Sequence, residues 1–339
     1  MQSTKKVVII THSEDITGML KELRASLEAR GVEVHRFDTD RFPLEAQASF
    51  SQDGDQGAIR FACGERSVVV GPDDAIWYRR ARFAEKLPRT IEPQMRQGCV
   101  IESKAFLRAL LAAAPCFVLD PPDLVRSRGH KLYQLRLARE LGMATPRTLV
   151  TNDPAEARAF IGSCPGGVVA KMLAGFPIYD ENGVEQVVFT TTLDEGHLDK
   201  LDGLRYSPMV FQEKLQKAVE LRITVIGGRM WAAAVDSQAV EGAEVDWRAR
   251  GVTLLRSWRE YTLPADLERA LHRYMERIGM HYSAIDVIVE PSGRHVFLEA
   301  NPAGECFWMQ YNAPHFPFSD ALADVLVGVP GARRSFLAQ

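Results

Sequence analysis

The segment from Ser283 to Pro302 most constrains the fold. It contains two apolar, β-branched runs separated by the turn sequence Pro291-Ser292-Gly293-Arg294. If Ser292 and Gly293 form a two-residue loop, counting back along both strands places Asp286 directly opposite Glu299. Their Cβ atoms would then lie about 4.5–5.5 Å apart on one face of the hairpin.

Two carboxylates held this close repel each other unless a cation lies between them. Asn301 lies two residues beyond Glu299 and therefore shares its face. Hard oxygen ligands of this kind suit Mg²⁺ when phosphate oxygens complete the coordination. We therefore predict that Asp286, Glu299 and Asn301 hold Mg²⁺. The alternative is a solvated hairpin whose polar residues face water.

The composition is that of an ordinary soluble protein, with 46% hydrophobic and 25% charged residues in 339. A net charge of −3 gives no electrostatic footprint for nucleic acid. No apolar run reaches the ~18 residues of a membrane span, and the polar N-terminus does not resemble a signal peptide. Five scattered cysteines without a Cys-x-x-Cys pair disfavour zinc and a disulfide framework and favour the cytoplasm.

The first third of the chain predicts an open α/β sheet. A strand over 7–10, a helix over 14–30 ending at Gly31, and a strand over 32–37 are typical of a parallel sheet. No Gly-x-Gly-x-x-Gly follows the first strand, so a dinucleotide site is not supported. Further elements are expected as antiparallel strands over 47–51, 58–62 and 67–70, a strand over 75–78, a helix over 93–114 and a strand over 117–119.

The pattern changes after the proline pair Pro121-Pro122, where we place the first domain boundary. Helices are expected over 131–141, 153–161, 194–201, 265–278 and 319–328. Strands are expected over 148–151, 168–172, 187–192 and 209–215, with a hairpin over 219–236 about Gly227-Gly228. We therefore predict three domains, covering residues 1–120, 121–215 and 216–339.

Two lysines lie where a cleft would need positive charge. Lys131 opens a helix after a loop, and Lys171 ends the apolar strand that begins at Val168. Phosphate is the usual ligand of such a charge. Either lysine alone is better read as a surface residue whose ammonium reaches solvent, but the pair together with the hairpin carboxylates favours a phosphate site.

The segment from Phe211 to Leu215 is extended and connects the two halves of this region. Its backbone can offer N–H and C=O groups to a flat base edge. In the next strand, Glu220 and Arg222 share a face opposite the apolar residues. Arg222 suits a bidentate clamp on a carboxylate or an acyl phosphate, and the alternative is a weak surface pair with Glu220.

The order of these residues resembles an ATP-grasp ligase: Lys131, Lys171, Gln212-Glu213-Lys214-Leu215, Glu220-x-Arg222, Asp286 and Glu299-x-Asn301. The chain is more similar to the ATP-grasp macrocyclases of the microviridin and wider graspetide class. That similarity rests on Ile9–Ser13 with Arg36–Phe42, Trp77-Tyr78-Arg79-Arg80, Asp246-Trp247-Arg248, and Leu298–Glu305 with Phe307-Trp308. The family often has Gln where this chain has Glu305.

The resemblance implies an α/β (α+β) ATP-grasp fold with an N-terminal α/β pre-ATP-grasp domain. It implies ATP between two sheets, with adenine at Gln212–Leu215, Glu220 also in the nucleotide site, and phosphates at Lys131 and Lys171. Mg²⁺ would lie on Asp286, Glu299 and Asn301. Arg222 and Lys171 are the implied catalytic residues.

The implied substrate is a precursor peptide with a leader and a core, and the implied assembly is a homodimer. An Asp or Glu side chain of the peptide would be activated as an acyl phosphate and joined to a Thr or Ser hydroxyl or a Lys amine. Arg222, Asp246 and Arg248 are the expected substrate contacts, although Asp246-Trp247-Arg248 would equally suit an interdomain contact. The hairpin over 174–192 is expected to be a lid or a leader contact, with Asp180, Glu181 and Glu185 pairing with a basic leader residue. The alternative there is a mobile acidic loop.

Two other functions remain open from the sequence. An ATP-grasp ligase for free amino acids, small peptides or a protein terminus would keep the same ATP residues and differ in its acceptor. A non-catalytic nucleotide-binding regulator would keep the fold without turnover. A P-loop kinase is disfavoured, because no Gly-x-x-x-x-Gly-Lys-Ser/Thr occurs.

Overall fold

The computed structural model describes residues 4–15, 18–53, 56–83, 85–173, 178–179, 181, 185–186, 190–247, 251–313 and 315–334. Within these ranges the chain forms five sheets with helices packed against them. None of the helices described there combines the length and the apolarity that a bilayer crossing requires.

The N-terminal sheet is parallel, with the strand order β2-β1-β6-β7. Helix α1 (Gly18–Glu28) connects β1 (Lys6–Thr11) to β2 (Glu33–Asp38), which confirms the strand–helix–strand prediction. The sheet is completed by β6 (Ala75–Tyr78) and β7 (Phe117–Leu119).

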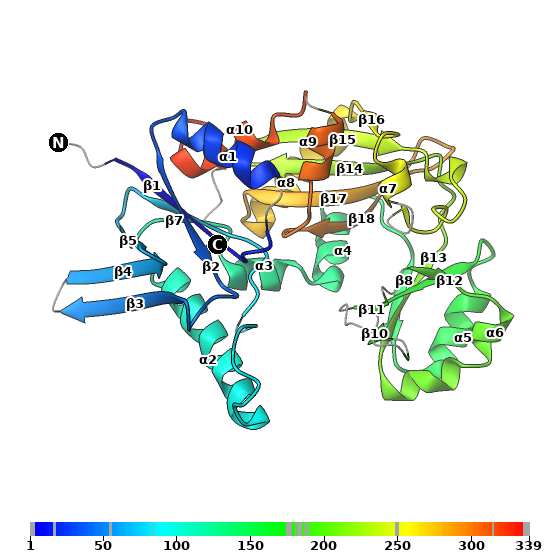
Figure 1. Ribbon diagram of the computed structural model, residues 1–339. Helices are drawn as coiled ribbons and strands as arrows, with labels where there is room; N and C mark the ends of the chain where they lie inside the picture. The colour runs from blue at the N-terminus through cyan, green and yellow to red at the C-terminus, as the bar shows by residue number, and fades with distance from the viewer. Residues whose placement is uncertain are drawn as a thin grey trace.

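A three-stranded antiparallel sheet extends from this layer, at the left of Figure 1. Its strands are β3 (Ala46–Asp53), β4 (Gln56–Cys63) and β5 (Arg66–Val70). Helix α2 (Pro93–Ala112) is capped at its N-terminus by Glu92, whose carboxylate accepts hydrogen bonds from the N–H groups of Gln94 and Met95. Apolar residues of α2, β4 and β5 share one core with the underside of the parallel sheet.

A helix begins at the proline pair. Pro122 is the first residue of α3 (Pro122–Arg128), a helix that we did not expect. Proline fits this position because the first N–H of a helix has no intrahelical partner and the fixed φ already suits a helix. Helix α4 (Lys131–Glu140) follows directly.

A four-stranded sheet of order β12-β9-β13-β8 lies at the right of Figure 1. Its strands are β8 (Thr148–Thr151), β9 (Val168–Lys171), β12 (Thr191–Thr192) and β13 (Met209–Glu213). Its helices are α5 (Pro154–Gly162), α6 (Glu195–Leu198) and the 3₁₀ helix η1 (Leu201–Tyr206). Ala157, Leu204 and Phe211 are buried between the sheet and these helices.

The hairpin region between β9 and β12 differs from the expected strand over 187–192. Two short antiparallel strands, β10 (Ile178–Tyr179) and β11 (Glu185–Gln186), pair with each other, and β12 pairs with β9 instead. Residues 182–184 and 187–189 lie outside the described residues.

The largest sheet has the order β16-β15-β14-β17-β18. Its strands are β14 (Val219–Ile226), β15 (Arg229–Val235), β16 (Arg259–Glu260), β17 (Tyr282–Val289) and β18 (His295–Asn301). Its region also contains η2 (Ser237–Ala239), α7 (Gly251–Leu254), α8 (Ala265–Ile278), α9 (Phe307–Asn312) and α10 (Phe318–Val327).

The two faces of this sheet belong to two cores. Helices α4 and α8 cover one face, which buries Ile223, Tyr274 and Phe297. The opposite face shares a core with α1, α10 and the N-terminal sheet. Helix α10 is therefore packed against α1, although these two helices come from opposite ends of the chain (Figure 1).

The β17–β18 hairpin has the predicted pairing of Asp286 with Glu299, but its turn differs from the predicted one. The assumed two-residue loop is wrong. Val289 pairs with His295, and the N–H of Glu290 donates to the carbonyl of Arg294 at 2.9 Å, which leaves a three-residue turn with Gly293 at a φ of +83°. The register then shifts by one residue, at a bulge between Asp286 and Val287. The bulge offsets the longer turn, so Asp286 still pairs with Glu299.

Candidate active site

A cavity of about 410 Å³ lies between the four-stranded and the five-stranded sheet. Its walls come from the ends of β9 and β13, from the connector after β13, and from β14, β17 and β18. Among the residues predicted from the sequence, those lining it are Lys171, Gln212, Glu213, Lys214, Leu215, Glu220, Asp246, Asp286 and Glu299. Segments far apart in the chain thus converge on one site.

Asp286 and Glu299 lie opposite each other at one end of this cavity, as predicted. Each carboxylate has its own cation. Lys131 Nζ lies 2.8 Å from Glu299 Oε2, and Arg222 Nη1 lies 2.9 Å from Asp286 Oδ1. Both acids remain partly accessible, with side-chain exposures of 20% for Asp286 and 23% for Glu299. The two carboxylates therefore combine fixed counter-charges with accessible oxygen atoms.

Arg222 is placed by the pairing of β14 with β17, which sets it directly beside Asp286. Nη1 donates to both Asp286 oxygens at 2.9 and 3.1 Å, and Nη2 donates to the carbonyl oxygen of Glu305 at 3.0 Å. Burial alone would lower the pKa of Arg222, but the Asp286 carboxylate outweighs it and raises that pKa. The alternative of a surface pair with Glu220 is therefore wrong.

Gly304 makes room for this guanidinium. A Cβ atom at Gly304 would lie 2.7 Å from Ala284 Cβ and 2.9 Å from Arg222 Nη2. The Gly304 carbonyl also accepts a hydrogen bond from the hydroxyl of buried Tyr282. The loop after β18 is thus held against Arg222 from two sides.

The connector after β13 is fixed along one cavity wall. Gln212 is buried and its Nε2 donates to Thr148 Oγ1 at 3.0 Å. Glu213 Oε1 accepts the N–H of Arg147 at 2.9 Å. The N–H of Lys214 donates to the carbonyl of Gly167, the residue before β9, at 2.9 Å. Val169, Ile288 and Leu298 add apolar surface to the same cavity. A flat apolar ring with polar edges would fit here.

Lys217 is a cavity residue that the sequence reasoning missed. Its Nζ lies 3.0 Å from Glu220 Oε1 and donates to the carbonyl of Val245 at 2.8 Å. Burial raises the pKa of Glu220, and Lys217 counters this only in part. The signal that could have found Lys217 is its position three residues before Glu220, in the connector already assigned to the nucleotide.

The remaining predicted residues have different surroundings. The Asn301 side chain turns toward its own loop, where Oδ1 accepts the N–H of Ala303 at 3.0 Å. Asp246 is buried in the cavity wall, and the N–H of Thr190 points to its Oδ2 at 3.5 Å. Glu181 is exposed, and Glu185 lies in β11. Asp180 and Arg248 lie outside the described residues.

Cys306 follows the loop that holds Arg222 and is fully buried. Burial raises the pKa of its thiol to about 12. The thiol therefore stays protonated near neutral pH, and the site does not present it as a thiolate nucleophile.

Comparisons with known proteins agree on one family. Residues 6–126 match the family model described as the MvdD pre-ATP-grasp domain. A search of curated proteins finds no match. Among solved structures, the macrocyclase MdnC from Microcystis aeruginosa MRC, bound to the precursor peptide MdnA, is 37% identical with a TM-score of 0.86. The match covers 95% of this chain and 99% of MdnC.

Two further structures extend this likeness. A RiPP-associated ATP-grasp ligase from Chryseobacterium gregarium, in complex with ADP and a leader and core peptide, is 34% identical with a TM-score of 0.91, covering 98% of this chain and 100% of that one. The macrocyclase MdnB from Microcystis aeruginosa MRC is 32% identical with a TM-score of 0.78, over 95% and 99% of the two chains. The chain therefore belongs to the ATP-grasp ligases and, within them, to the family of RiPP-associated ATP-grasp macrocyclases.

Proposed function

We propose that this protein is an ATP-dependent macrocyclase of a ribosomally made precursor peptide. It activates Asp or Glu side-chain carboxylates of the peptide as acyl phosphates and joins them to Thr or Ser hydroxyls or to Lys amines. The observation that carries this proposal is the cavity between two sheets that is lined by Asp286 and Glu299, whose carboxylates pair with Arg222 and Lys131. The relatives solved with precursor peptides support a peptide as the substrate.

ATP is proposed to lie in the cavity, with its base against the connector from Gln212 to Leu215. The backbone groups of that connector face a flat base edge, and the apolar wall packs on the ring. Lys171 at the end of β9 and Lys131 at the start of α4 then approach the phosphates from two elements. Two ammonium groups, one lining the cavity and one paired with Glu299, favour the polyanionic part of the nucleotide.

The chemistry of the donor set fits Mg²⁺. Asp286 and Glu299 offer partly accessible carboxylate oxygens, and phosphate oxygens would complete an octahedral shell. Asn301 would join them if its side chain left the N–H of Ala303. When bound, Mg²⁺ neutralises charge on the β- and γ-phosphates.

The proposed reaction has two displacements. A carboxylate oxygen of the peptide attacks the γ-phosphorus of ATP, the bond to the β-phosphate oxygen breaks, and ADP leaves. A hydroxyl or amine of the same peptide then attacks the acyl carbon, phosphate leaves with the bonding electron pair, and the nucleophile loses a proton. Arg222 lies beside Asp286, and its positive charge stabilises the negative charge that develops in both steps.

Two further parts of the proposal concern binding. The segment between β9 and β12, which includes the exposed Glu181, is proposed to contact the leader of the peptide. The protein is also proposed to act as a homodimer, which sedimentation velocity at assay concentration would test. A monomeric mass there would remove the dimer while leaving the chemistry intact.

The test of the reaction is the intact mass of a candidate precursor, encoded beside this gene, after incubation with the protein, ATP and Mg²⁺. We expect the loss of one water mass per ring together with one ADP per ring. Mild base then distinguishes esters, which open, from amides, which do not. An unchanged peptide with ADP released indicates a different acceptor, such as a free amino acid. An unchanged peptide without ADP indicates a non-catalytic nucleotide-binding protein.

A further inference from the structure

A second charged cluster lies outside the cavity, at the carboxyl ends of the N-terminal strands. The chain leaves β1 toward β2 on one side, while β6 flanks β1 on the other side. In open α/β sheets, ligands bind in the crevice that such a reversal of strand order creates. The residues that follow these strands include Asp15 after β1 and the pair Arg79-Arg80 after β6.

The inner half of this cluster is a fixed ion pair. Asp15 is fully buried, and its Oδ2 lies 2.9 Å from Arg79 Nε. The hydroxyl of Thr11 donates to the same oxygen at 2.6 Å. Burial alone would raise the pKa of Asp15, but Thr11 and Arg79 hold it below its usual value. This pair stays charged and positions the Arg79 guanidinium toward the crevice.

The outer half of the cluster is loosely paired. Glu305 Oε2 lies 3.2 Å from Arg79 Nη2 and 3.5 Å from Arg80 Nη1, and the side chains of Arg80 and Glu305 are 48% and 36% exposed. Arg80 has a φ of +43°, and it is the sole non-glycine residue with positive φ in the described part of the chain. Such backbone strain is typical of functional sites.

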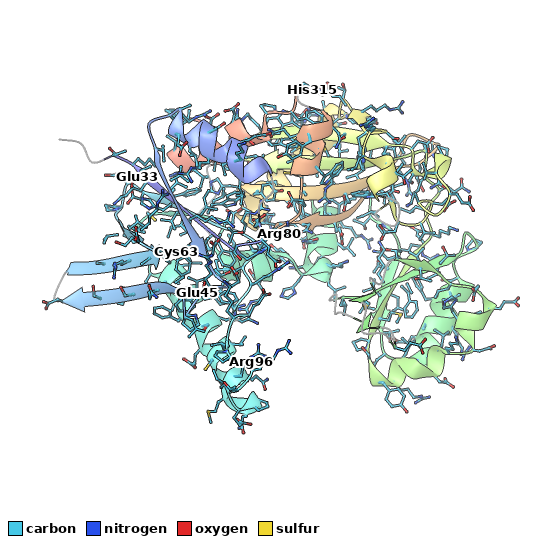
Figure 2. All side chains as sticks on the ribbon, in the orientation of Figure 1. Glu33, Glu45, Cys63, Arg80, Arg96 and His315 are labelled. Atoms are coloured by element: carbon cyan, nitrogen blue, oxygen red, sulfur yellow. The ribbon has the colours of Figure 1, made fainter. Side chains whose placement is uncertain are left out.

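Glu305 connects this cluster to the candidate active site. Its carbonyl oxygen accepts a hydrogen bond from Arg222 Nη2, so its backbone is fixed while its carboxylate points to the arginines. Figure 2 places Arg80 between the N-terminal sheet and the end of β18. A group bound at Arg79 and Arg80 would therefore lie next to the site of chemistry.

Buried His12 adds an unpaired polar atom to the same strand ends. Its Nδ1 has no hydrogen-bond partner among the described residues. Burial and the nearby Arg82 and Arg80 guanidinium groups lower the pKa of His12, so the ring is neutral near pH 7. A neutral ring here can hydrogen-bond a ligand without adding charge to the cluster.

We propose that Arg79 and Arg80 form a subsite for a carboxylate of the substrate peptide, and that Glu305 occupies this subsite until the peptide displaces it. The inference rests on the proposed peptide substrate. The charges of Arg79 and Arg80 are matched by those of Asp15 and Glu305, so one incoming carboxylate can replace Glu305 without changing the charge of the cluster. Exposed, long ion pairs are weak enough for this exchange.

The proposal explains how Glu305 would tune the site. A glutamate competes with the peptide for the arginines, whereas a glutamine at this position would leave them available. Glu305→Gln is therefore expected to tighten carboxylate binding by about three- to fivefold, because one weak, exposed charge pair that competes for the arginines is removed. Arg80→Gln introduced together with Glu305→Gln is expected to abolish that gain.

Glu14→Gln is the matched control. Glu14 is 74% exposed and pairs with Arg82 at 2.6 Å, at the same edge of the sheet. The Glu14→Gln substitution removes one negative charge from the same edge of the sheet but leaves the ion pairs of Arg79 and Arg80 intact. The affinity for the carboxylate peptide is expected to rise by less than about twofold in this control, because solvent and salt screen a charge at an exposed site.

The experiment measures the binding of two capped tripeptides by calorimetry, without nucleotide or Mg²⁺. Acetyl-Gly-Glu-Gly-amide carries only a side-chain carboxylate, and acetyl-Gly-Gln-Gly with a free C-terminus carries only a terminal one. A Glu305-dependent gain with either peptide supports the subsite and identifies the source of its carboxylate. Equal gains in Glu305→Gln and Glu14→Gln, no gain with either peptide, or a gain that survives Arg80→Gln would overturn it.

Thermal unfolding of each variant confirms that the fold is intact before binding is measured. Because the binding assay needs no turnover, it fails or succeeds independently of the mass assay for ring formation. Wild-type protein that forms rings while Glu305→Gln gains no affinity would reject the subsite alone. A Glu305-dependent gain in a protein that forms no rings would instead reject the proposed reaction and keep the subsite.

Discussion

Two clusters of arginines and acids in this protein differ in which charge is buried and which is accessible. At the β17–β18 hairpin, the buried partner is the Arg222 guanidinium, and the partly exposed carboxylates of Asp286 and Glu299 line the cavity. At the ends of β1 and β6, the buried partner is the Asp15 carboxylate, and the Arg80 guanidinium faces solvent. The first cluster presents acids to a cation, and the second presents arginines to an anion.

The difference follows from where the strands place each side chain. Cross-strand neighbours in an antiparallel sheet share one face, so Arg222, Asp286 and Glu299 form a row in which the two carboxylates line the cavity. Parallel strands instead end at one edge, where loops bring charges together around a crevice. A pair of opposite charges therefore reveals little about its role until the exposed partner is known.

The largest effect is expected at Arg222. Arg222→Ala should lower turnover by roughly 10²–10³-fold, because it removes a positive charge that we propose stabilises the reacting groups. It should also lower the free energy of unfolding by about 3–5 kcal/mol, because Asp286 loses its partner in a partly buried site. Ring formation by mass spectrometry and urea unfolding measure the two effects.

Glu299→Gln separates activity from stability in the same cluster. Turnover should fall by a similar roughly 10²–10³-fold, while the free energy of unfolding changes by only about 0–1 kcal/mol because the pair with Lys131 is partly exposed. Wild-type rates in this variant would remove Glu299 from the proposed site.

In the N-terminal cluster, removal of the buried acid should cost more stability than removal of the exposed acid. Asp15→Asn should lower the free energy of unfolding by about 3 kcal/mol, since it leaves the buried Arg79 without its main counter-charge. Glu305→Gln should change it by less than about 1 kcal/mol, because that carboxylate is exposed. Equal costs for the two variants would contradict the division into a fixed half and an exchangeable half.

Gly304→Ala tests the packing that joins the two clusters. The added methyl group would approach Ala284 and Arg222 within 2.9 Å or less. The loop must shift, which should cost about 1–3 kcal/mol of stability and reduce turnover through Arg222. Gly203→Ala is the control, because nothing lies within 4 Å of an added Cβ there. Wild-type turnover in Gly304→Ala would show that Arg222 tolerates the shift.

The last prediction concerns the pH dependence of stability. Because burial raises the pKa of Glu220, the folded state keeps a proton that the unfolded state has lost above about pH 4.3. The stability contributed by Glu220 therefore decreases as pH rises through its raised pKa. Lys217→Met should steepen this decrease by about 1–2 kcal/mol between pH 5 and 8, measured by urea unfolding. Lys131→Met, at a partly exposed pair, should leave the slope unchanged.

Much of the local structure could be predicted because it depends on neighbouring residues. The apolar alternation of β14 and β17 and the 3.6-residue spacing of α8 are present in the sequence itself. The helix α3 was missed because Pro121-Pro122 was read only as an interruption, although proline also suits the first helical turn. The pairing of Asp286 with Glu299 was predicted correctly from a wrong loop, since turn length and bulge offset each other.

By itself, the sequence determined most of the strands and helices, the acid pair on the hairpin and the resemblance to a family, because these depend on local pattern and residue order. Only the tertiary structure decided which cation meets which acid. Arg222 joins Asp286 because β14 is hydrogen-bonded to β17, and Lys217, not Arg222, pairs with Glu220. Arg79 meets Glu305 across 226 positions of sequence because the loop after β18 packs against the edge of the N-terminal sheet. Such contacts depend on how buried surfaces pack together, and no spacing along the chain encodes them.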